Sequence, residues 1–303
     1  MKLTVDHMYL LTGLVLLAFS ARSFLDGGNR KRLGNGLFWG VYGLTFLLGG
    51  LVPNRVIGFM VVLLAALGSF DMMGRGSYGE TTREERMARA AAMGNRIFLP
   101  ALIIPLVTFG VAKFTSLGAL VGLGLGTVVG FVAAALMLRE GPLVSVEEGR
   151  RLIDAIGWSA ILSQFLAALG FLFDKAGVGA VVAGMVSSVV SHGSRLAAVV
   201  AYCVGMALFT MVMGNAFAAF AVITTGIGIP MVVMQGADPS VAGVIGMLSG
   251  YCGTLMTPMA ANFNVVPAAL LEIRDKNRVI VAQVPVALAM LVANVVLMYT
   301  LAF

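Results

Sequence analysis

Long apolar runs alternate with short polar segments along the whole chain, and most of these runs have the length of a membrane-spanning helix. A bilayer is crossed by about 20 consecutive apolar residues in helical form. The runs that approach this length predict membrane helices over residues 7–24, 34–52, 56–72, 97–114, 117–138, 158–173 and 279–302. The run at 177–190 is too short to cross, so a connecting helix is expected there. Residues 7–24 also have the general form of a secretory signal peptide, but the many spans that follow favour a first membrane helix.

Two polar inserts carry the signals of helices at the membrane surface. In the first insert, Thr81 and Thr82 each precede a glutamate by three residues, an arrangement that caps helix N-termini, and a short helix is predicted over 82–93. The second insert, over 145–157, predicts an amphipathic helix that contains Arg150 and Arg151. Because arginine and lysine are enriched in cytoplasmic loops, we place both inserts on the cytoplasmic side.

Residues 213–264 depart from the general pattern because small polar residues interrupt the apolar segments. The first segment halts at Gly214 and Asn215, resumes, and reaches Pro230, where a helix is expected to end. Each arm is at the short end for crossing a bilayer. We therefore expect a re-entrant helical hairpin over 196–230 that opens to the outside and has Asn215 near the membrane centre. Two ordinary spans joined by a very short loop are the alternative.

A second interrupted element follows a polar turn over 236–240, whose Asp-Pro-Ser sequence suits a helix start. One half-helix is predicted over 241–248 and the other over 258–271. The segment between them is rich in glycine and threonine, and Pro258 disfavours helix at Thr257. Unpaired backbone groups at membrane depth must be satisfied by protein or a water-filled cavity, so the two breaks are expected to face each other and form half of a transport site. A proline-kinked helix without a ligand is the alternative.

Composition supports a membrane protein and removes several other classes. Of the 303 residues, 59% are hydrophobic and only 11% are charged, which no soluble domain of this size could accommodate. The net charge of +6 comes from basic residues between apolar runs, so nucleic acid is not an expected partner. Cys203 and Cys252 lie in apolar segments, and His7 and His192 are far apart, so neither a disulfide framework, a metal site nor a bound cofactor is predicted. The membrane segments show no pattern of a protease, so an enzyme is not expected.

Together these elements predict an all-α polytopic membrane protein of about seven to eight spans, with one re-entrant hairpin and one broken helix. Residues 1–145 are expected to form the N-terminal scaffold helices. Residues 146–195 are expected to hold the amphipathic segment, the sixth span and a connector. Residues 196–303 are expected to form the transport unit, made of the hairpin (196–230), the broken helix (240–271) and the final helix (279–302).

The sequences at the two breaks resemble those of the ion transporter superfamily, whose members are elevator-type carriers of carboxylates such as citrate, succinate and gluconate. GNAFAAFAVITTGIGIP (214–230) resembles the hairpin tip of that superfamily, and GMLSGYCGTLMTPMAANFN (246–264) resembles the broken helix after it. Asn215 matches the tip asparagine, and the positions that match the break are Gly253, Thr254, Thr257, Pro258 and Asn262. The two hydroxyl residues of the superfamily tip are replaced by Gly214 and Ala216, which puts sodium coordination by hydroxyls in doubt. The resemblance covers residues 155–303.

More closely, the whole chain resembles the larger of two paired bacterial membrane proteins regarded as subunits of a 5-oxoproline (pyroglutamate) transporter. That family is typically encoded beside pyrrolidone-carboxylate peptidase. MLSGYCGTLMTPMAANFNVVPAALLEI (247–273) carries this match. The resemblance implies a secondary-transporter subunit of the bacterial cytoplasmic (inner) membrane, which moves a small carboxylate, 5-oxoproline, by an elevator mechanism.

The candidate site residues gather at the two breaks. The residues expected to bind substrate are Gly214, Asn215, Thr224, Gly253, Thr254, Thr257, Pro258 and Asn262. The residues expected to bind a coupling ion are Asn215, Gly250, Thr254 and Asn264. Because no basic residue lies within the breaks, backbone amides at helix N-termini are expected to hold the carboxylate. No acidic residue lies between Arg195 and Asp238, so Na⁺ held by carbonyl oxygens is favoured over H⁺ as the coupling ion.

A single chain is expected to supply only half of a carrier. Superfamily carriers build their site from two inverted units, each a hairpin plus a broken helix, and no second pair of such motifs occurs in residues 1–195. The missing half is expected from a second small membrane subunit or from a second copy of this chain. The alternative function is a non-transporting membrane scaffold or a regulatory subunit of a partner carrier.

Overall fold

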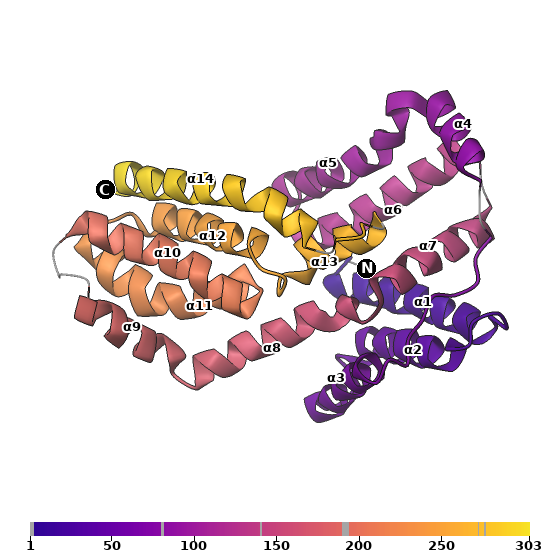
Figure 1. Cartoon of the computed structure of the whole chain (residues 1–303), viewed down its shortest axis with the longest axis horizontal. Coiled ribbons are helices and arrows are strands. Elements are labelled where there is room, and N and C mark those ends of the chain that lie inside the picture. The colour runs from indigo at the N-terminus through magenta and orange to yellow at the C-terminus, as the bar shows by residue number, and fades with distance from the viewer. Residues whose placement is uncertain (1–2, 80–81, 140, 190–193, 272, 276) are drawn as a thin grey trace. The chain divides into compact units, whose positions relative to one another are not determined.

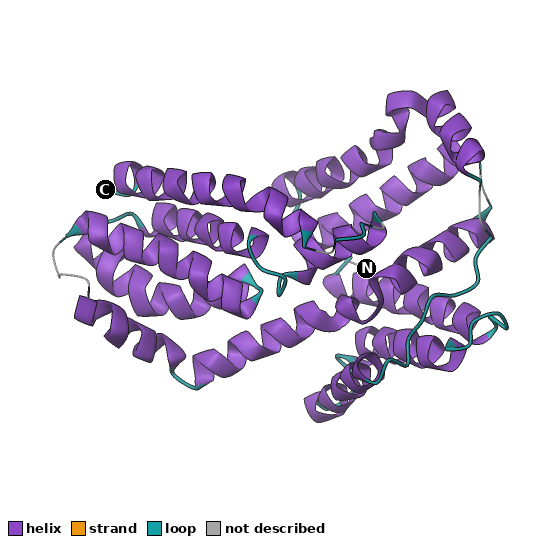
Figure 2. Cartoon of the chain, in the orientation of Figure 1, coloured by secondary structure: helices purple, strands orange, loops and turns teal. Residues whose placement is uncertain are grey.

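The computed structural model describes residues 3–79, 82–139, 141–189, 194–271, 273–275 and 277–303, and all regular structure in these residues is helical (Figure 2). Seven stretches of the described residues are long and apolar enough to cross a membrane: Val5–Phe24, Glu84–Phe114, Ala119–Leu138, Leu143–Phe173, Arg195–Met213, Ala216–Gln235 and Arg278–Leu301. The chain is therefore an all-α polytopic membrane protein, as the sequence predicts. It divides into an N-terminal unit, Met1–Trp158, and a C-terminal unit, Ser159–Phe303.

The N-terminal unit consists of two helix pairs with smaller elements around them (Figure 1). Its elements are α1 (Val5–Phe24), α2 (Arg32–Leu48), α3 (Asn54–Ser69), α4 (Arg83–Met93), the 3₁₀ turn η1 (Gly94–Phe98), α5 (Leu99–Phe114), α6 (Ala119–Leu138) and α7 (Pro142–Ile156). Helix α1 packs along α2, and α5 packs along α6. Helices α2 and α3 have 17 and 16 residues, so both are shorter than the predicted spans.

The C-terminal unit is built around the hairpin formed by α10 and α11. Its elements are the 3₁₀ turn η2 (Gly157–Ile161), which begins at the unit boundary, then α8 (Leu162–Lys175), α9 (Val178–Val189), α10 (Arg195–Met213), α11 (Ala216–Ile223), the π-helix η3 (Thr224–Val232), the 3₁₀ turn η4 (Val233–Gln235), α12 (Pro239–Leu255), α13 (Ala261–Leu270) and α14 (Arg278–Leu301). Helix α12 packs against both α10 and α14 (Figure 1). Helix α9 has 12 residues, which is too short to cross a bilayer of about 20-residue helices, as expected.

Two helix starts form through the local hydrogen bonds that the sequence predicts. The backbone N–H of Glu85 donates to Thr82 Oγ1 at 3.2 Å, and the Thr82 N–H donates to Glu85 Oε2 at 3.2 Å, so α4 begins with a capping box. At α12, Asp238 Oδ1 accepts from the N–H groups of Ser240 and Val241. Thr81, the other predicted cap, and His192 lie outside the described residues.

A buried ionic cluster joins α7 to the loops of the N-terminal unit. The Arg150 side chain is only 4% exposed, and its Nη1 lies 2.8 Å from Asp26 Oδ2 in the loop after α1. Its Nη2 donates to the Ser77 carbonyl oxygen at 3.1 Å, and its guanidinium lies over the Tyr78 ring. Tyr78 in turn donates its hydroxyl to Asp154 on α7. Because each buried charge has a partner, the cluster holds the polar loop at 74–78 against α7.

The pKa of Asp26 predicts how this cluster responds to acid. Burial raises the pKa of the carboxyl, but hydrogen bonds from the Ser77 side chain and backbone and from Arg150 outweigh burial and lower the pKa to about 2. The contribution of the Asp26 carboxylate to stability is therefore complete at a pH above the pKa that this carboxyl has in the unfolded chain. It is lost as the pH falls through about 2, the pKa in the folded protein. We expect Asp26→Asn to be less stable than the wild type at neutral pH, with a difference that shrinks as the pH falls from about 4 to about 2. Unfolding free energies of both proteins across that range test this. A difference that stays constant with pH would contradict it.

The second arm of the hairpin continues beyond the point where the sequence predicts its end. Pro230 was expected to terminate the helix, but it lies inside the π-helix η3, which runs to Val232 and leads into η4. Proline in an α-helix collides with the carbonyl four residues earlier, and a wider π-helical turn relieves that collision. The arm Ala216–Gln235 consequently has 20 residues and α10 has 19, so neither arm is too short to cross. The re-entrant path of the hairpin stays a prediction.

Helix α12 also extends further than the sequence predicts. The break was expected to begin at Gly250, but α12 is helical to Leu255, and the interruption comprises residues 256–260 only. Gly250 and Gly253 lie inside the helix because they serve packing. A Cβ at Gly253 would overlap the carbonyl oxygen of Ala207 on α10, and a Cβ at Gly250 would lie 2.8 Å from Met206 Cε. These glycines bring α12 close to α10, as small residues do between membrane helices.

Candidate functional site

The hairpin turns at Gly214, where the backbone is in the left-handed region. Gly214 has φ +68°, a conformation that favours glycine, and its N–H donates to the Thr210 carbonyl oxygen to end α10. Asn215 then caps α11, because its Oδ1 accepts from the N–H groups of Phe217 at 2.9 Å and Ala218 at 3.3 Å. The Gly-Asn pair thus makes the turn and starts the second arm, as predicted.

The hairpin tip contacts the interruption between α12 and α13. A Cβ at Gly214 would lie 2.6 Å from the carbonyl oxygen of Met259, so only glycine allows this approach. Thr257 provides a second link, because its hydroxyl donates to the Met211 carbonyl oxygen at 2.9 Å and accepts from the Met259 N–H at 3.2 Å. The two breaks therefore face each other.

Asn264 satisfies the backbone groups that the interruption exposes. Its side chain is buried, and its Nδ2 donates to the carbonyl oxygens of Thr254 at 2.8 Å and Thr257 at 2.6 Å. Its Oδ1 is buried without a hydrogen-bond partner among the described residues. Buried polar atoms are nearly always paired in proteins, so this amide oxygen marks a place where a bound water or ion would be accommodated.

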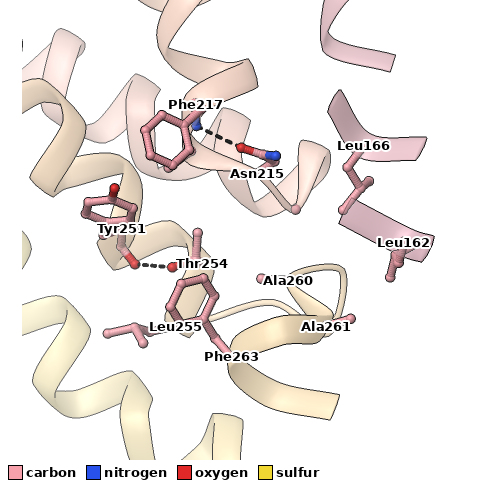
Figure 3. A pocket seen from close by; sticks show the side chains of 12 residues that line it. Leu162, Leu166, Asn215, Phe217, Tyr251, Thr254, Leu255, Ala260, Ala261 and Phe263 are labelled. Atoms are coloured by element: carbon pink, nitrogen blue, oxygen red, sulfur yellow. Dashed lines mark hydrogen bonds between the residues drawn. The ribbon is translucent and has the colours of Figure 1, made fainter. Parts of the chain in front are cut away.

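A cavity of about 400 Å³ opens where the tip and the interruption meet (Figure 3). This volume lies within the range of small-molecule sites, about 300–1,000 Å³. The lining comes from α8, the hairpin tip, the end of α12 and the start of α13, and none of the described lining residues is charged: Leu162, Leu166, Gly214, Asn215, Ala216, Phe217, Tyr251, Thr254, Leu255, Ala260, Ala261 and Phe263. The first turns of α11 and α13 therefore both line this cavity.

Of the predicted substrate- and ion-binding residues whose side chains the structure describes, three line this cavity: Gly214, Asn215 and Thr254. Thr257 and Asn264 lie behind it and hold the interruption in place through the bonds described above. Pro258 is exposed and does not line the cavity. Asn262 lies in the first turn of α13, but its side chain lies outside what the structure describes.

Thr224 lies far along the second arm from the tip and does not line the cavity. Its Oγ1 is hydrogen bonded to the Tyr202 hydroxyl at 2.8 Å, at the start of the π-helix. Tyr202 is fully buried, and a Cβ at Gly228 would lie 2.8 Å from its ring. Thr224 therefore satisfies a buried hydroxyl between the hairpin arms, and Gly250 and Gly253 pack against α10, so the geometry gives these three residues structural roles.

Sequence reasoning did not identify the apolar walls of the cavity. Leu162 and Leu166 on α8 face the cavity across from Tyr251, and Phe263 projects from the start of α13 (Figure 3). The rings of Phe217 and Tyr251 meet edge to face, with centroids 6.1 Å apart. The i,i+4 spacing of the two leucines predicts one helix face. It cannot distinguish a face that lines a site from one that meets lipid, because both are apolar.

The fold and the site define a polytopic helical membrane protein whose interrupted helices enclose a small uncharged cavity. The chain belongs to the DUF979 family, whose description is "protein of unknown function", and the family model matches residues 6–303. No curated protein and no solved structure matches the chain.

Proposed function

We propose that the chain is a subunit of a secondary transporter that moves a small carboxylate, 5-oxoproline, across the bacterial inner membrane by an elevator mechanism. The observation that carries the proposal is the cavity between the hairpin tip and the helix interruption. Carriers bind substrate at discontinuous helices, whose N-terminal ends attract anions. The identity of the substrate rests on the sequence resemblance. A ring of this size fits the volume, and its apolar edge suits the aromatic walls.

The geometry favours Asn215 over free helix amides as the group that contacts the carboxylate. Asn215 Oδ1 already occupies the first turn of α11, where it accepts from two backbone N–H groups. The Nδ2 of Asn215 donates to no described residue, and the side chain lines the cavity. A carboxylate is therefore bound by the Asn215 amide nitrogen in the positive field of the α11 N-terminus. The Thr254 hydroxyl donates to the Tyr251 carbonyl oxygen at 2.7 Å, so Thr254 lines the cavity at the opposite break without donating to the carboxylate.

A coupling Na⁺ is placed at oxygen atoms near the interruption in this proposal. The candidate ligands are Asn264 Oδ1, which lacks a hydrogen-bond partner in the described residues, and carbonyl oxygens that the break exposes. Among the described residues no carboxylate lines the cavity, so Na⁺ is preferred to a proton as the coupling ion in this proposal. The second half of the carrier comes from another membrane subunit or from a second copy of this chain.

The proposal is tested by uptake of labelled 5-oxoproline into proteoliposomes that contain the chain with its candidate second subunit. Asn215→Asp is the sharpest variant, because aspartate keeps the helix cap and places a negative charge against the substrate carboxylate. We expect uptake to fall at least about tenfold while folding is preserved. Thr257→Ala is expected to lower uptake as well, because it releases the interruption from the hairpin.

Thr300→Val on α14 is the matched control for the threonine, because its hydroxyl bonds only within its own helix and its side chain is exposed. Full uptake by both Asn215→Asp and Thr257→Ala would show that the site assignment is wrong. If the wild-type pair transports no carboxylate, the transport proposal fails, and a non-transporting scaffold or regulatory subunit becomes the better interpretation.

A further inference from the structure

Glycines on α6 hold the α5–α6 pair of the N-terminal unit closely together. Toward the connecting turn at 115–118, glycines let the helices touch, since a Cβ at Gly122 would lie 2.9 Å from the Thr108 carbonyl oxygen and one at Gly126 would lie 2.6 Å from that of Ile104. Gly130 continues this stripe at 3.1 Å from the Pro100 carbonyl oxygen. The next position of the stripe on α6 is Ala134, another small residue, which lines a groove beside the pair.

A groove of about 500 Å³ runs along the pair, and its lining comes mainly from the first half of α5 and the second half of α6. Its walls include Ile97, Ile104, Phe131, Met137 and Leu138. The one polar side chain in the lining, Thr127, bonds its hydroxyl to the Leu123 carbonyl oxygen at 2.9 Å and so presents only its methyl group. The groove is therefore apolar throughout and suits a hydrocarbon chain.

Apart from Met93 at the end of α4, the groove is lined by α5, α6 and η1 among the described elements. Helix α5 packs substantially only against α6 and η1, and none of its residues is buried. Ile97 and Phe131 are 49% and 54% exposed although they line the groove. The groove is accessible from the side of the helix pair, and a ligand in the bilayer can enter it without moving a helix.

Two arginines flank the end of the groove where α5 begins and α6 ends. Arg96 in η1 directly precedes Ile97, and Arg139, the C-cap residue of α6, directly follows Leu138. Helix α5 begins at the end of the pair where α6 ends (Figure 1). Ile97 and Leu138 both line the groove, so the two adjacent arginines lie at that same end. Both are exposed, and neither has an ion-pair partner among the described residues. The N-capped helix α4, with Arg86, adjoins this end through η1.

An apolar groove with two arginines at one end, neither of them in an ion pair with a described residue, has the chemistry of an anionic phospholipid site. We propose that the groove binds one anionic phospholipid, with an acyl chain along Ile104 and Phe131 and its phosphate between Arg96 and Arg139. Acidic lipids are abundant in the cytoplasmic leaflet, where arginine-rich inserts are expected. A partner helix with only apolar residues would also fill the groove, but it would give the two arginines no acceptor.

Native mass spectrometry of the delipidated full chain measures this directly. Phosphatidylglycerol and phosphatidylcholine with identical acyl chains are added in turn, and the fraction of protein that retains one lipid is compared. We expect a preference for phosphatidylglycerol of about thirtyfold, the contribution of two arginines near an anionic headgroup. The variant Arg96→Gln/Arg139→Gln is expected to retain both lipids equally.

Arg55→Gln/Arg274→Gln is the matched control, because it removes the same charge from exposed arginines outside the groove and is expected to keep the preference. Ala134→Phe fills the groove and is expected to lose phosphatidylglycerol although both arginines remain. The proposal is overturned if the wild type shows no headgroup preference, if the arginine pair variant keeps it, or if Ala134→Phe retains the lipid. A dimer of the chain that Ala134→Phe abolishes, without lipid retention, would instead place a second copy in the groove.

Discussion

Replacement of Arg150 by methionine is expected to lower the free energy of unfolding by about 3–5 kcal/mol. The side chain of Asp26 is 3% exposed, and Arg150 is its ion-pair partner at 2.8 Å. Methionine keeps most of the volume of arginine but leaves that carboxylate buried without its cation, and it leaves the Ser77 carbonyl oxygen without a donor. The loss should be measured by denaturant titration in detergent. Trp39 fluorescence is a local reporter, because its Nε1 donates to Asp154 in the same cluster at 2.8 Å.

The neighbouring residue provides the control for this experiment. Arg151 lies on the same helix and pairs with Glu148 at 2.8 Å, but its side chain is 46% exposed. Water screens that pair, so Arg151→Met is expected to change stability by at most about 0.5 kcal/mol. Arg150→Met/Asp26→Leu removes both buried charges and is expected to recover most of the lost stability. If Arg150→Met and Arg151→Met lower the free energy of unfolding equally, burial does not determine how much each ion pair contributes to stability.

Replacement of Gly253 by alanine is the second change with a large expected effect. The added methyl group would overlap the Ala207 carbonyl oxygen and lie 2.9 Å from Thr210 Cβ. The first is a backbone atom of α10, and the second is bonded directly to that backbone. Neither atom can rotate away, so α12 must move from α10. Overpacking of this kind costs about 1–3 kcal/mol. A denaturant titration of the variant measures the loss of unfolding free energy. The thermal stability and the protease resistance of the C-terminal unit are independent measures of the same loss.

Gly243 provides the matched position on the same helix. A Cβ there would meet only Phe220 Cζ at 3.8 Å, an ordinary contact. Gly243→Ala is expected to be neutral or to stabilise the helix by up to about 1 kcal/mol, because alanine is the better helix former. If Gly253→Ala is as stable as Gly243→Ala, the close packing of α12 on α10 does not require glycine at position 253.

Features that depend on a few neighbouring residues could be predicted from the sequence. Thr82 with Glu85 and Asp238 with Ser240 start helices through bonds within one turn, and the structure contains those bonds. The Gly214-Asn215 turn is also local, since glycine supplies the left-handed backbone and asparagine caps the next helix. Apolar runs likewise predicted the helical membrane class, because backbone groups in lipid must be paired within a helix.

The extent of the broken helix could not be predicted in this way. Glycine and proline both favour interruption locally, so Gly250 and Pro230 were each placed at the end of a helix. In the structure, contacts with α10 hold Gly250 inside α12, and a π-helical turn carries the second arm past Pro230. Both outcomes depend on tertiary contacts and on the backbone geometry around each residue. Local sequence patterns do not determine either of these.

The sequence by itself determined that this protein is an all-α membrane protein with one turned hairpin and one interrupted helix that carry small polar residues. The tertiary structure decided which of those residues share a site. Asn215 and Thr254 line one cavity with leucines from α8, whereas Thr224 is hydrogen bonded to Tyr202 and Gly253 packs on α10. The physical reason is that polarity and turn propensity are local properties. The side of a helix that faces a cavity depends on helix packing across distant segments.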